Sequence, residues 1–259
     1  MASINKNGYI DCMNHAPVMV LGSGGAAAGA DTTVSHIQLG RYVLEKYHNG
    51  ALDDDDSIAD ARAIVANVGN GLQVSIDSDD DFGCEFGFGI LADANRFGAF
   101  KIGTDPAFFF EAKIGLDDVS NYQVCAVGFR KAAAYVTIDD EPTDLGSAVQ
   151  YTDFSYVNGN AGAIETVMAV NQTGGGTGTA TAVDSTENWA DLASKTLRVN
   201  VSATGVCSWL VDGAALTTVS AVTTFDTDDI VIPSLLFVKA EAGAVGDNAV
   251  IEHIKIGLQ

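Results

Sequence analysis

Residues 105–116 show a two-residue alternation that strongly limits what this chain can fold into. The turn-forming pair Asp105-Pro106 opens the segment. Apolar residues then occupy every second position: Phe108, Phe110, Ala112, Ile114 and Leu116. The positions between them are Phe109, Glu111, Lys113 and Gly115. A period of two is typical of a β-strand with one buried and one wetter face. We therefore predict a central strand here, around which other strands pack.

Short strand-like runs separated by turn residues fill most of the remaining chain. They span residues 37–47, 72–76, 82–91, 97–103, 122–129, 149–157, 164–171, 177–183, 197–201, 206–211, 230–239 and 250–258. Residues 57–60 could start a short helix, whereas 63–68 could equally form a strand, and the sequence leaves both open. Because no long helical pattern or repeat accompanies these runs, they predict an all-β, antiparallel sandwich. A sandwich of 259 residues can be one domain.

The first part of the chain has a different composition. Residues 1–35 carry little charge, lack alternation and include the Gly/Ala-rich run 22–30. Such a segment is typical of an extended or flexible arm. It is either simply disordered or a tether that becomes ordered on a neighbouring subunit. We expect an N-terminal arm over residues 1–35 and a sandwich domain over residues 36–259.

The charge balance excludes some classes of partner. The chain has 34 acidic and 13 basic residues, for a net charge of −21. Such a surface repels phosphate backbones and anionic membranes, so we predict neither a nucleic-acid partner nor a membrane partner. Solubility through like-charge repulsion explains the acidity better than recognition of a basic partner does.

The cysteines indicate a reducing compartment. Cys12, Cys84, Cys125 and Cys207 form no C-x-x-C pair. The last three lie in strand-like runs, where cysteine behaves as a small apolar residue. We expect free thiols and folding in a reducing cytosol, and the short apolar run 16–21 lacks the flanks of a secretory signal.

Metal binding receives little support from the sequence. Asp77, Asp79 and Asp81 have the spacing of a calcium loop, but Phe82 and Phe88 replace the glycine and glutamate that such a loop needs. A solvated acidic loop is therefore the favoured interpretation. The four histidines show no metal-ligand spacing: His15, His36, His48 and His253. We predict no metal ligand and no cofactor.

Known sandwich enzymes are also disfavoured. Laminarinase-type glucanases carry their carboxylates on one strand as E-x-D-x-x-E, whereas neither Glu111 nor Glu165 is followed by the other acidic residues. No G-x-S-x-G motif is present. We therefore predict no catalytic residue and no enzymatic activity.

Two tryptophans bear on sugar binding. Trp189 precedes a strand and could stack on a sugar, although we favour the interpretation that it plugs one end of the sandwich. Trp209 lies within a predicted core strand.

Three stretches in a fixed order carry a family resemblance. The first is residues 100–113, FKIGTDPAFFFEAK, and the second is residues 127–131, VGFRK. The third combines Asn188-Trp189-Ala190-Asp191 with residues 196–201 and Val211-Asp212-Gly213. Together they resemble the concanavalin A-like, laminin-G-like jelly-roll proteins of tailed-phage virions. The resemblance covers residues 65–259, and the end of the chain, residues 250–259, resembles the closing strand of that family.

This resemblance implies a jelly-roll structural protein of a virion, made in the host cytoplasm. It implies a decoration or cement protein on the outer capsid surface, with the major capsid protein and further copies of itself, as a homotrimer, for partners. The first alternative is a carbohydrate-binding tail or fibre module for host attachment, and the second is a glucanase-like enzyme. The family supplies no catalytic motif to carry over.

We predict that all four cysteines are reduced, because their strand positions and spacing favour buried, unpaired side chains. Thiol titration of the denatured protein without reductant should find four reactive groups. Two or fewer would show that disulfides form.

Overall fold

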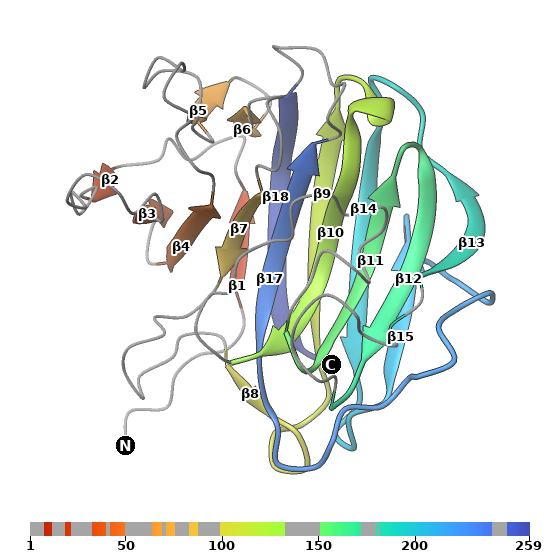
Figure 1. Ribbon diagram of the computed structural model, residues 1–259. Helices are drawn as coiled ribbons and strands as arrows, with labels where there is room; N and C mark the ends of the chain where they lie inside the picture. The colour runs from red at the N-terminus through yellow and green to blue at the C-terminus, as the bar shows by residue number, and fades with distance from the viewer. Residues whose placement is uncertain are drawn as a thin grey trace.

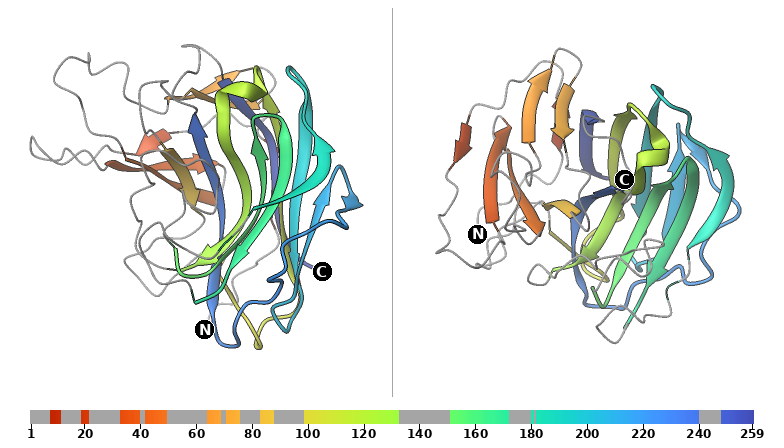
Figure 2. Two further views of the ribbon diagram at one scale, coloured as in Figure 1. Left: turned by 45° about the vertical axis from the view of Figure 1, so that its right-hand side comes forward. Right: turned by 45° about the horizontal axis from the view of Figure 1, so that its top comes forward.

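The structure is a computed structural model. It describes residues 99–132, 151–171, 180, 182–239 and 248–259, together with the backbone of seven strands before residue 99. In those earlier strands, side chains are described at residues 71–74 and 85–87. The strands form two facing antiparallel sheets, with one short 3₁₀ helix, η1 (Val119–Asn121), as the helix of the described chain. Figures 1 and 2 show the two layers.

An eight-stranded sheet forms one layer. Its order is β16 (Ala214–Ala215), β15 (Cys207–Val211), β14 (Ser194–Val201), β9 (Phe108–Leu116), β18 (Asn248–Leu258), β6 (Gly71–Ser75) and β5 (Ile64–Val68). The short strand β1 (Gly8–Asp11) also pairs with β18. The predicted strand of residues 105–116 is therefore central, because β9 lies between β14 and β18.

A ten-stranded sheet forms the other layer. Its order is β13 (Val183–Asn188), β12 (Ala163–Ala169), β11 (Phe154–Asn160), β10 (Tyr122–Lys131), β17 (Ile230–Lys239), β7 (Gly83–Gly87), β4 (Tyr42–Asn49), β3 (Thr33–Leu39) and β2 (Met19–Leu21). The two-residue strand β8 (Phe100–Lys101) pairs with β17. The antiparallel jelly-roll sandwich predicted from the sequence is confirmed.

An aromatic cluster joins the two sheets. The rings of Phe100 and Phe108 stack with centroids 4.1 Å apart, and Phe129 meets both rings edge-on at 6.1 Å and 5.1 Å. Phe108 comes from β9 and Phe129 from β10, so this contact crosses the space between the layers. All three side chains are completely buried. Edge-to-face and offset rings add to the stability that burial alone provides.

Strand β10 is buried on both of its faces. Val127 and Phe129 belong to the core between the sheets, whereas Val124 and Ala126 belong to a second apolar cluster on the outer side of the ten-stranded sheet. The run Val-Cys-Ala-Val-Gly-Phe lacks polar alternation because neither face meets water, and a continuous apolar run is typical of such a strand.

The structure corrects several predicted strand boundaries. The single strand expected at residues 37–47 is two strands, β3 and β4, which pair with each other antiparallel. The strand expected at 97–103 shortens to β8, since Gly103 adopts a positive φ of 78° in the following turn. The open segment 63–68 forms the strand β5.

Two further boundaries move later in the chain. The strand expected at 149–157 begins only at Phe154. Most of the strand expected at 177–183 lies outside the described residues, and the strand that the structure describes here is β13, a polar edge strand that shares only Val183 with the prediction.

The N-terminal segment contains strands in the structure. Strands β1 and β2 and the start of β3 fall within residues 1–35, and β1 pairs with residues 253–256 of β18. The division into an arm and a domain at residue 35 stays a prediction. Among the described residues, no helix is long and apolar enough to span a membrane.

We predict that Gly128→Ala lowers the free energy of unfolding by more than about 3 kcal/mol. A Cβ at Gly128 would lie 2.0 Å from the Ser155 carbonyl oxygen, so β10 and β11 would have to separate. Gly115→Ala is the matched control, because its Cβ would meet side chains alone, the Ser194 hydroxyl at 3.1 Å and Glu252 Oε1 at 4.0 Å. Urea unfolding of both variants measures the difference. Equal stabilities would contradict the packing described for β10.

Candidate functional site

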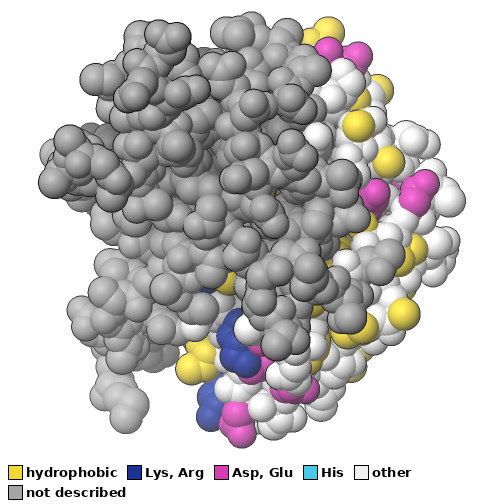
Figure 3. Space-filling view, in the orientation of Figure 1, with side chains coloured by type: hydrophobic (Ala, Val, Ile, Leu, Met, Phe, Trp, Pro, Cys, Tyr) yellow, Lys and Arg dark blue, Asp and Glu magenta, His cyan; other side chains and the backbone are white. Residues whose placement is uncertain are grey.

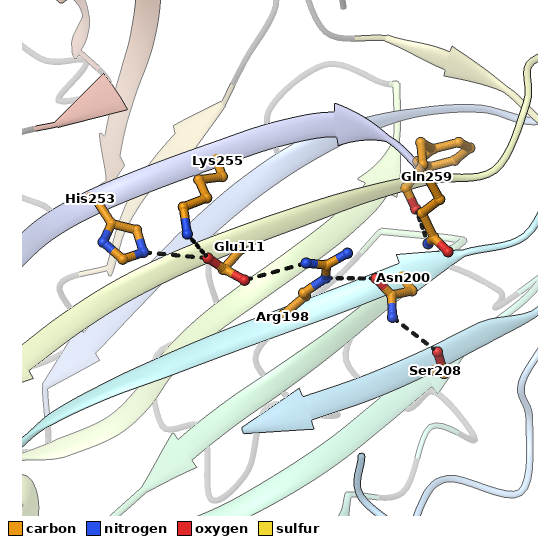
Figure 4. A network of polar contacts seen from close by, with 8 residues as sticks. Glu111, Arg198, Asn200, Ser208, His253, Lys255 and Gln259 are labelled. Atoms are coloured by element: carbon orange, nitrogen blue, oxygen red, sulfur yellow. Dashed lines mark hydrogen bonds and ion pairs between the residues drawn. The ribbon is translucent and has the colours of Figure 1, made fainter. Parts of the chain in front are cut away.

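Polar side chains gather on the outer face of the eight-stranded sheet. We call this surface the polar face. It consists of the outward residues of β9, β14 and β18: Phe109, Glu111, Lys113, Thr196, Arg198, Asn200, Glu252, His253 and Lys255. Figure 4 shows its central part. It lies opposite the apolar core because the alternation of β9 sends Phe108 and Phe110 inward and Glu111 outward.

Strand register places one carboxylate between two cations. In the pairing of β14 with β9, Arg198 lies opposite Glu111, and in the pairing of β18 with β9, Lys255 lies opposite the same residue. Directly opposed residues of antiparallel strands bring their side chains within reach of each other. The sheet register, rather than any short motif, therefore builds this group.

Glu111 is the centre of the polar face. Its Oε1 atom lies 2.8 Å from Lys255 Nζ and 3.4 Å from His253 Nε2, and its Oε2 atom lies 3.5 Å from Arg198 Nη1. Hydrogen bonding by His253 and Lys255, with the charges of Lys255 and Arg198, lowers the pKa of Glu111 to about 2 despite its burial. The carboxylate therefore stays ionised at physiological pH and is a poor proton donor.

Arg198 is held in one orientation. Its guanidinium carbon lies 3.8 Å from the centroid of the Phe109 ring, and its Nε donates to Asn200 Oδ1 at 2.7 Å. Asn200 in turn donates to Ser208 Oγ at 3.4 Å. Stacking and hydrogen bonding of this kind fix an arginine whose charge is permanent.

A second polar group is buried in the ten-stranded sheet. Arg130 Nε donates to Glu85 Oε1 at 2.5 Å, Tyr151 donates its hydroxyl to Glu85 Oε2 at 2.5 Å, and Ser234 donates to Glu85 Oε1 at 3.0 Å. None of these side chains is more than 4% exposed. Burial opposes the charged form of Arg130, yet the charge of Glu85 raises the pKa of Arg130 overall. Burial also raises the pKa of Tyr151, so this group is a closed structural network.

The described carboxylates that have a shifted pKa are not prepared for acid catalysis. Every one with a shifted pKa has it lowered: Glu111, Asp118, Asp153, Asp212 and Glu252. A general acid needs a pKa raised toward the working pH. The two glutamates considered from the sequence are not paired either, since Glu111 lies in the eight-stranded sheet and Glu165 in the ten-stranded one.

Trp189 is a plug, as the favoured interpretation predicted. The side chain is 3% exposed, its ring packs where a Cβ on Gly159 would stand, and its Nε1 donates to the Ala193 carbonyl at 2.9 Å. A buried ring has no free face on which a sugar could stack. Trp209 is buried in the core, as expected.

The other sequence candidates lie partly outside the described residues. Cys125 and Cys207 are buried free thiols, and burial raises the pKa of Cys207 to about 12. The remaining candidates lie outside the described side chains: Cys12, His15, His36, His48, Asp77, Asp79, Asp81, Phe82, Cys84 and Phe88. Within the described part of the chain, no three His, Cys, Asp or Glu side chains are grouped to hold a metal ion.

Sequence reasoning found the strands of the polar face but missed its network. The outward positions of Glu111, Arg198 and Asn200 follow from the alternation. Which outward residues meet depends on strand order and register across 144 residues of sequence, as between Glu111 and Lys255. No local signal in one sequence gives that register.

Comparisons with known proteins support only the fold. The chain matches no family model and no curated protein. A β-glucanase from Bacillus licheniformis is 11% identical, with a TM-score of 0.48, and the match covers 98% of this chain and 99% of that one. A legume lectin-like domain from Entamoeba histolytica is 9% identical, with a TM-score of 0.48 and coverage of 76% and 88%.

An alginate lyase from Pseudomonas aeruginosa is 14% identical, with a TM-score of 0.45, and the match covers 78% of this chain and 89% of that one. The similar structures thus include both lectin-like domains and enzymes. At these identities and TM-scores they carry no argument about activity.

We predict that Glu111→Gln lowers the free energy of unfolding at pH 7 by roughly 2–3 kcal/mol. The folded pKa of Glu111 lies near 2 and its ordinary value is 4.5, so its contribution is complete above pH 4.5 and declines as the pH falls toward 2. Urea unfolding at a series of pH values should show the two proteins converging in that window.

Asp228→Asn is the control, because Asp228 forms an exposed pair with Lys101. Loss of an exposed pair costs less than about 1 kcal/mol. A difference between wild type and Glu111→Gln that does not change with pH would contradict the ion-pair account.

Proposed function

We propose that this chain is a structural protein of a tailed-phage virion, which binds the outer capsid surface and stabilises the shell. Its partners would be the major capsid protein and further copies of itself, as a homotrimer. The observation that supports a structural role over a catalytic one is the state of its carboxylates. Glu111 is held by cations, and the other four described carboxylates with a shifted pKa also have it lowered, so none of these five is prepared to donate a proton.

The charge of the chain supports a position outside the shell. With a net charge of −21, a protein lining the interior would face packaged DNA and be repelled by it. On the outer surface the same charge keeps particles apart. In this proposal the protein acts by buried contact area and carries no catalytic residue.

Trp189 motivated the carbohydrate-binding alternative, but its side chain is buried and cannot stack on a sugar. The exposed large apolar side chains of the described residues are aliphatic: Leu192, Val206, Val222, Ile230 and Leu258. Among the described aromatic side chains, Phe109 alone is not fully buried, and the Arg198 guanidinium stacks on its ring. A module for host attachment remains the alternative outcome of the test below.

We predict that particles lacking this protein assemble but release their DNA at a lower temperature, or at a milder osmotic shock, than complete particles. Bridging contacts of at least standard interface size resist the pressure of packaged DNA. Adding the purified protein back should restore resistance and saturate at a stoichiometry set by the lattice. Dye-detected DNA release on heating measures the effect. If depleted particles are equally robust but fail to adsorb to host cells, the cementing proposal is wrong and the host-attachment alternative replaces it.

A further inference from the structure

The turn between β13 and β14 holds a leucine that is unfavourable for the isolated protein in two ways. Leu192 is 82% exposed, and its φ of 57° lies in the left-handed region. A bulky residue with positive φ is an outlier, because its Cβ crowds the backbone, and glycine or asparagine adopts this conformation more easily. Leu192 therefore contributes strain without contributing to the core.

Hydrogen bonds hold this turn firmly in place. Leu192 donates its N–H to the Leu116 carbonyl at 3.0 Å, and Ala193 donates to the Ala190 carbonyl at 3.2 Å. Asp191 accepts the Val119 N–H at 3.0 Å, which ties the turn to η1. The strained backbone is therefore fixed by its surroundings, and the leucine side chain is presented to solvent on a rigid support.

The neighbouring residues form a small apolar tip with an acidic rim. The half-buried Val119 lies beside the turn of Ala161 and Gly162, where Ala161 is exposed and also has a positive φ of 45°. The surrounding carboxylates have no cation within ion-pair distance in the described part of the chain: Asp117, Asp118, Glu187 and Asp191. In Figure 3, hydrophobic and acidic side chains meet at the top edge, above the end of the sandwich where Figure 1 shows the short helical turn η1.

We propose that this tip, centred on Leu192, is a docking knob that inserts into an apolar pocket with a basic rim on a protein of the capsid shell. Backbone strain that persists in a rigid, exposed position points to function, because folding alone would favour another residue. A central apolar anchor within a polar rim is typical of protein interfaces. The rim carboxylates match a basic surface, which selects the charge of the partner.

This inference rests on the proposed function, and it makes an unusual prediction about stability. Leu192→Asn relieves the backbone strain and removes the knob. The purified variant should therefore melt about 2–4 °C above wild type, while its affinity for particles depleted of this protein falls at least tenfold. A residue with a purely structural role would show the opposite change in melting temperature.

The experiment combines differential scanning calorimetry of the purified full-length proteins with co-sedimentation on depleted particles. Leu192→Gly is a second variant, which should also melt above wild type and bind depleted particles more weakly. Val222→Ala is the control, because Val222 is also an exposed apolar residue (45% exposed) but has no positive φ. The control should bind like wild type. Asp191 is left intact because it holds Val119.

Each other outcome overturns a definite statement. If wild type and Leu192→Asn bind depleted particles equally, the knob is wrong and the capsid role stands. If Leu192→Asn melts below wild type, the turn is not strained and the argument for the knob fails. If wild type does not bind depleted particles, the capsid role fails and the knob with it. Binding of wild type to host cells that Leu192→Asn lacks would assign the knob to a host partner.

Discussion

The packing of β9 against β10 is the contact on which the rest of the sandwich depends. Phe108 from β9 and Phe129 from β10 are completely buried and meet edge to face between the sheets. Because side chains alternate along a strand, the same packing that sends Phe108 inward fixes Glu111 on the outside. A one-residue slip of β9 would expose the aromatic cluster and bury the charged residues, so core and polar face are specified together.

Charged side chains of the described residues link strands in both sheets. On the polar face, Glu111 is surrounded by Arg198 and Lys255 from the two strands that flank β9. In the other sheet, the buried pair of Glu85 and Arg130 joins β7 to β10, and Tyr151 also donates its hydroxyl to Glu85. Removing one partner of such a buried pair is strongly destabilising, because the other charge is then left buried and uncompensated.

The sequence predicted the architecture well where one face of a strand is wet, because alternation then appears in the residues, as in Phe108–Leu116. It did not predict β13, whose polar edge sequence carries no apolar period. The burial of Arg130 could not be predicted from local sequence, because its partner Glu85 lies 45 residues away. The strain at Leu192 was equally hidden, because its positive φ accompanies a hydrogen bond to the Leu116 carbonyl and so follows from tertiary structure rather than from local preference.

The central claim is that this sandwich is a component of a capsid shell, and its position on the particle tests that claim most directly. A cryo-electron microscopy reconstruction of the intact virion, with the protein identified by a labelled or deleted copy, would locate every ordered copy. The account predicts copies distributed over the whole outer shell at lattice positions, with the Leu192 end turned toward the shell protein. Copies confined to the tail or its fibres, or none on the particle, would contradict it.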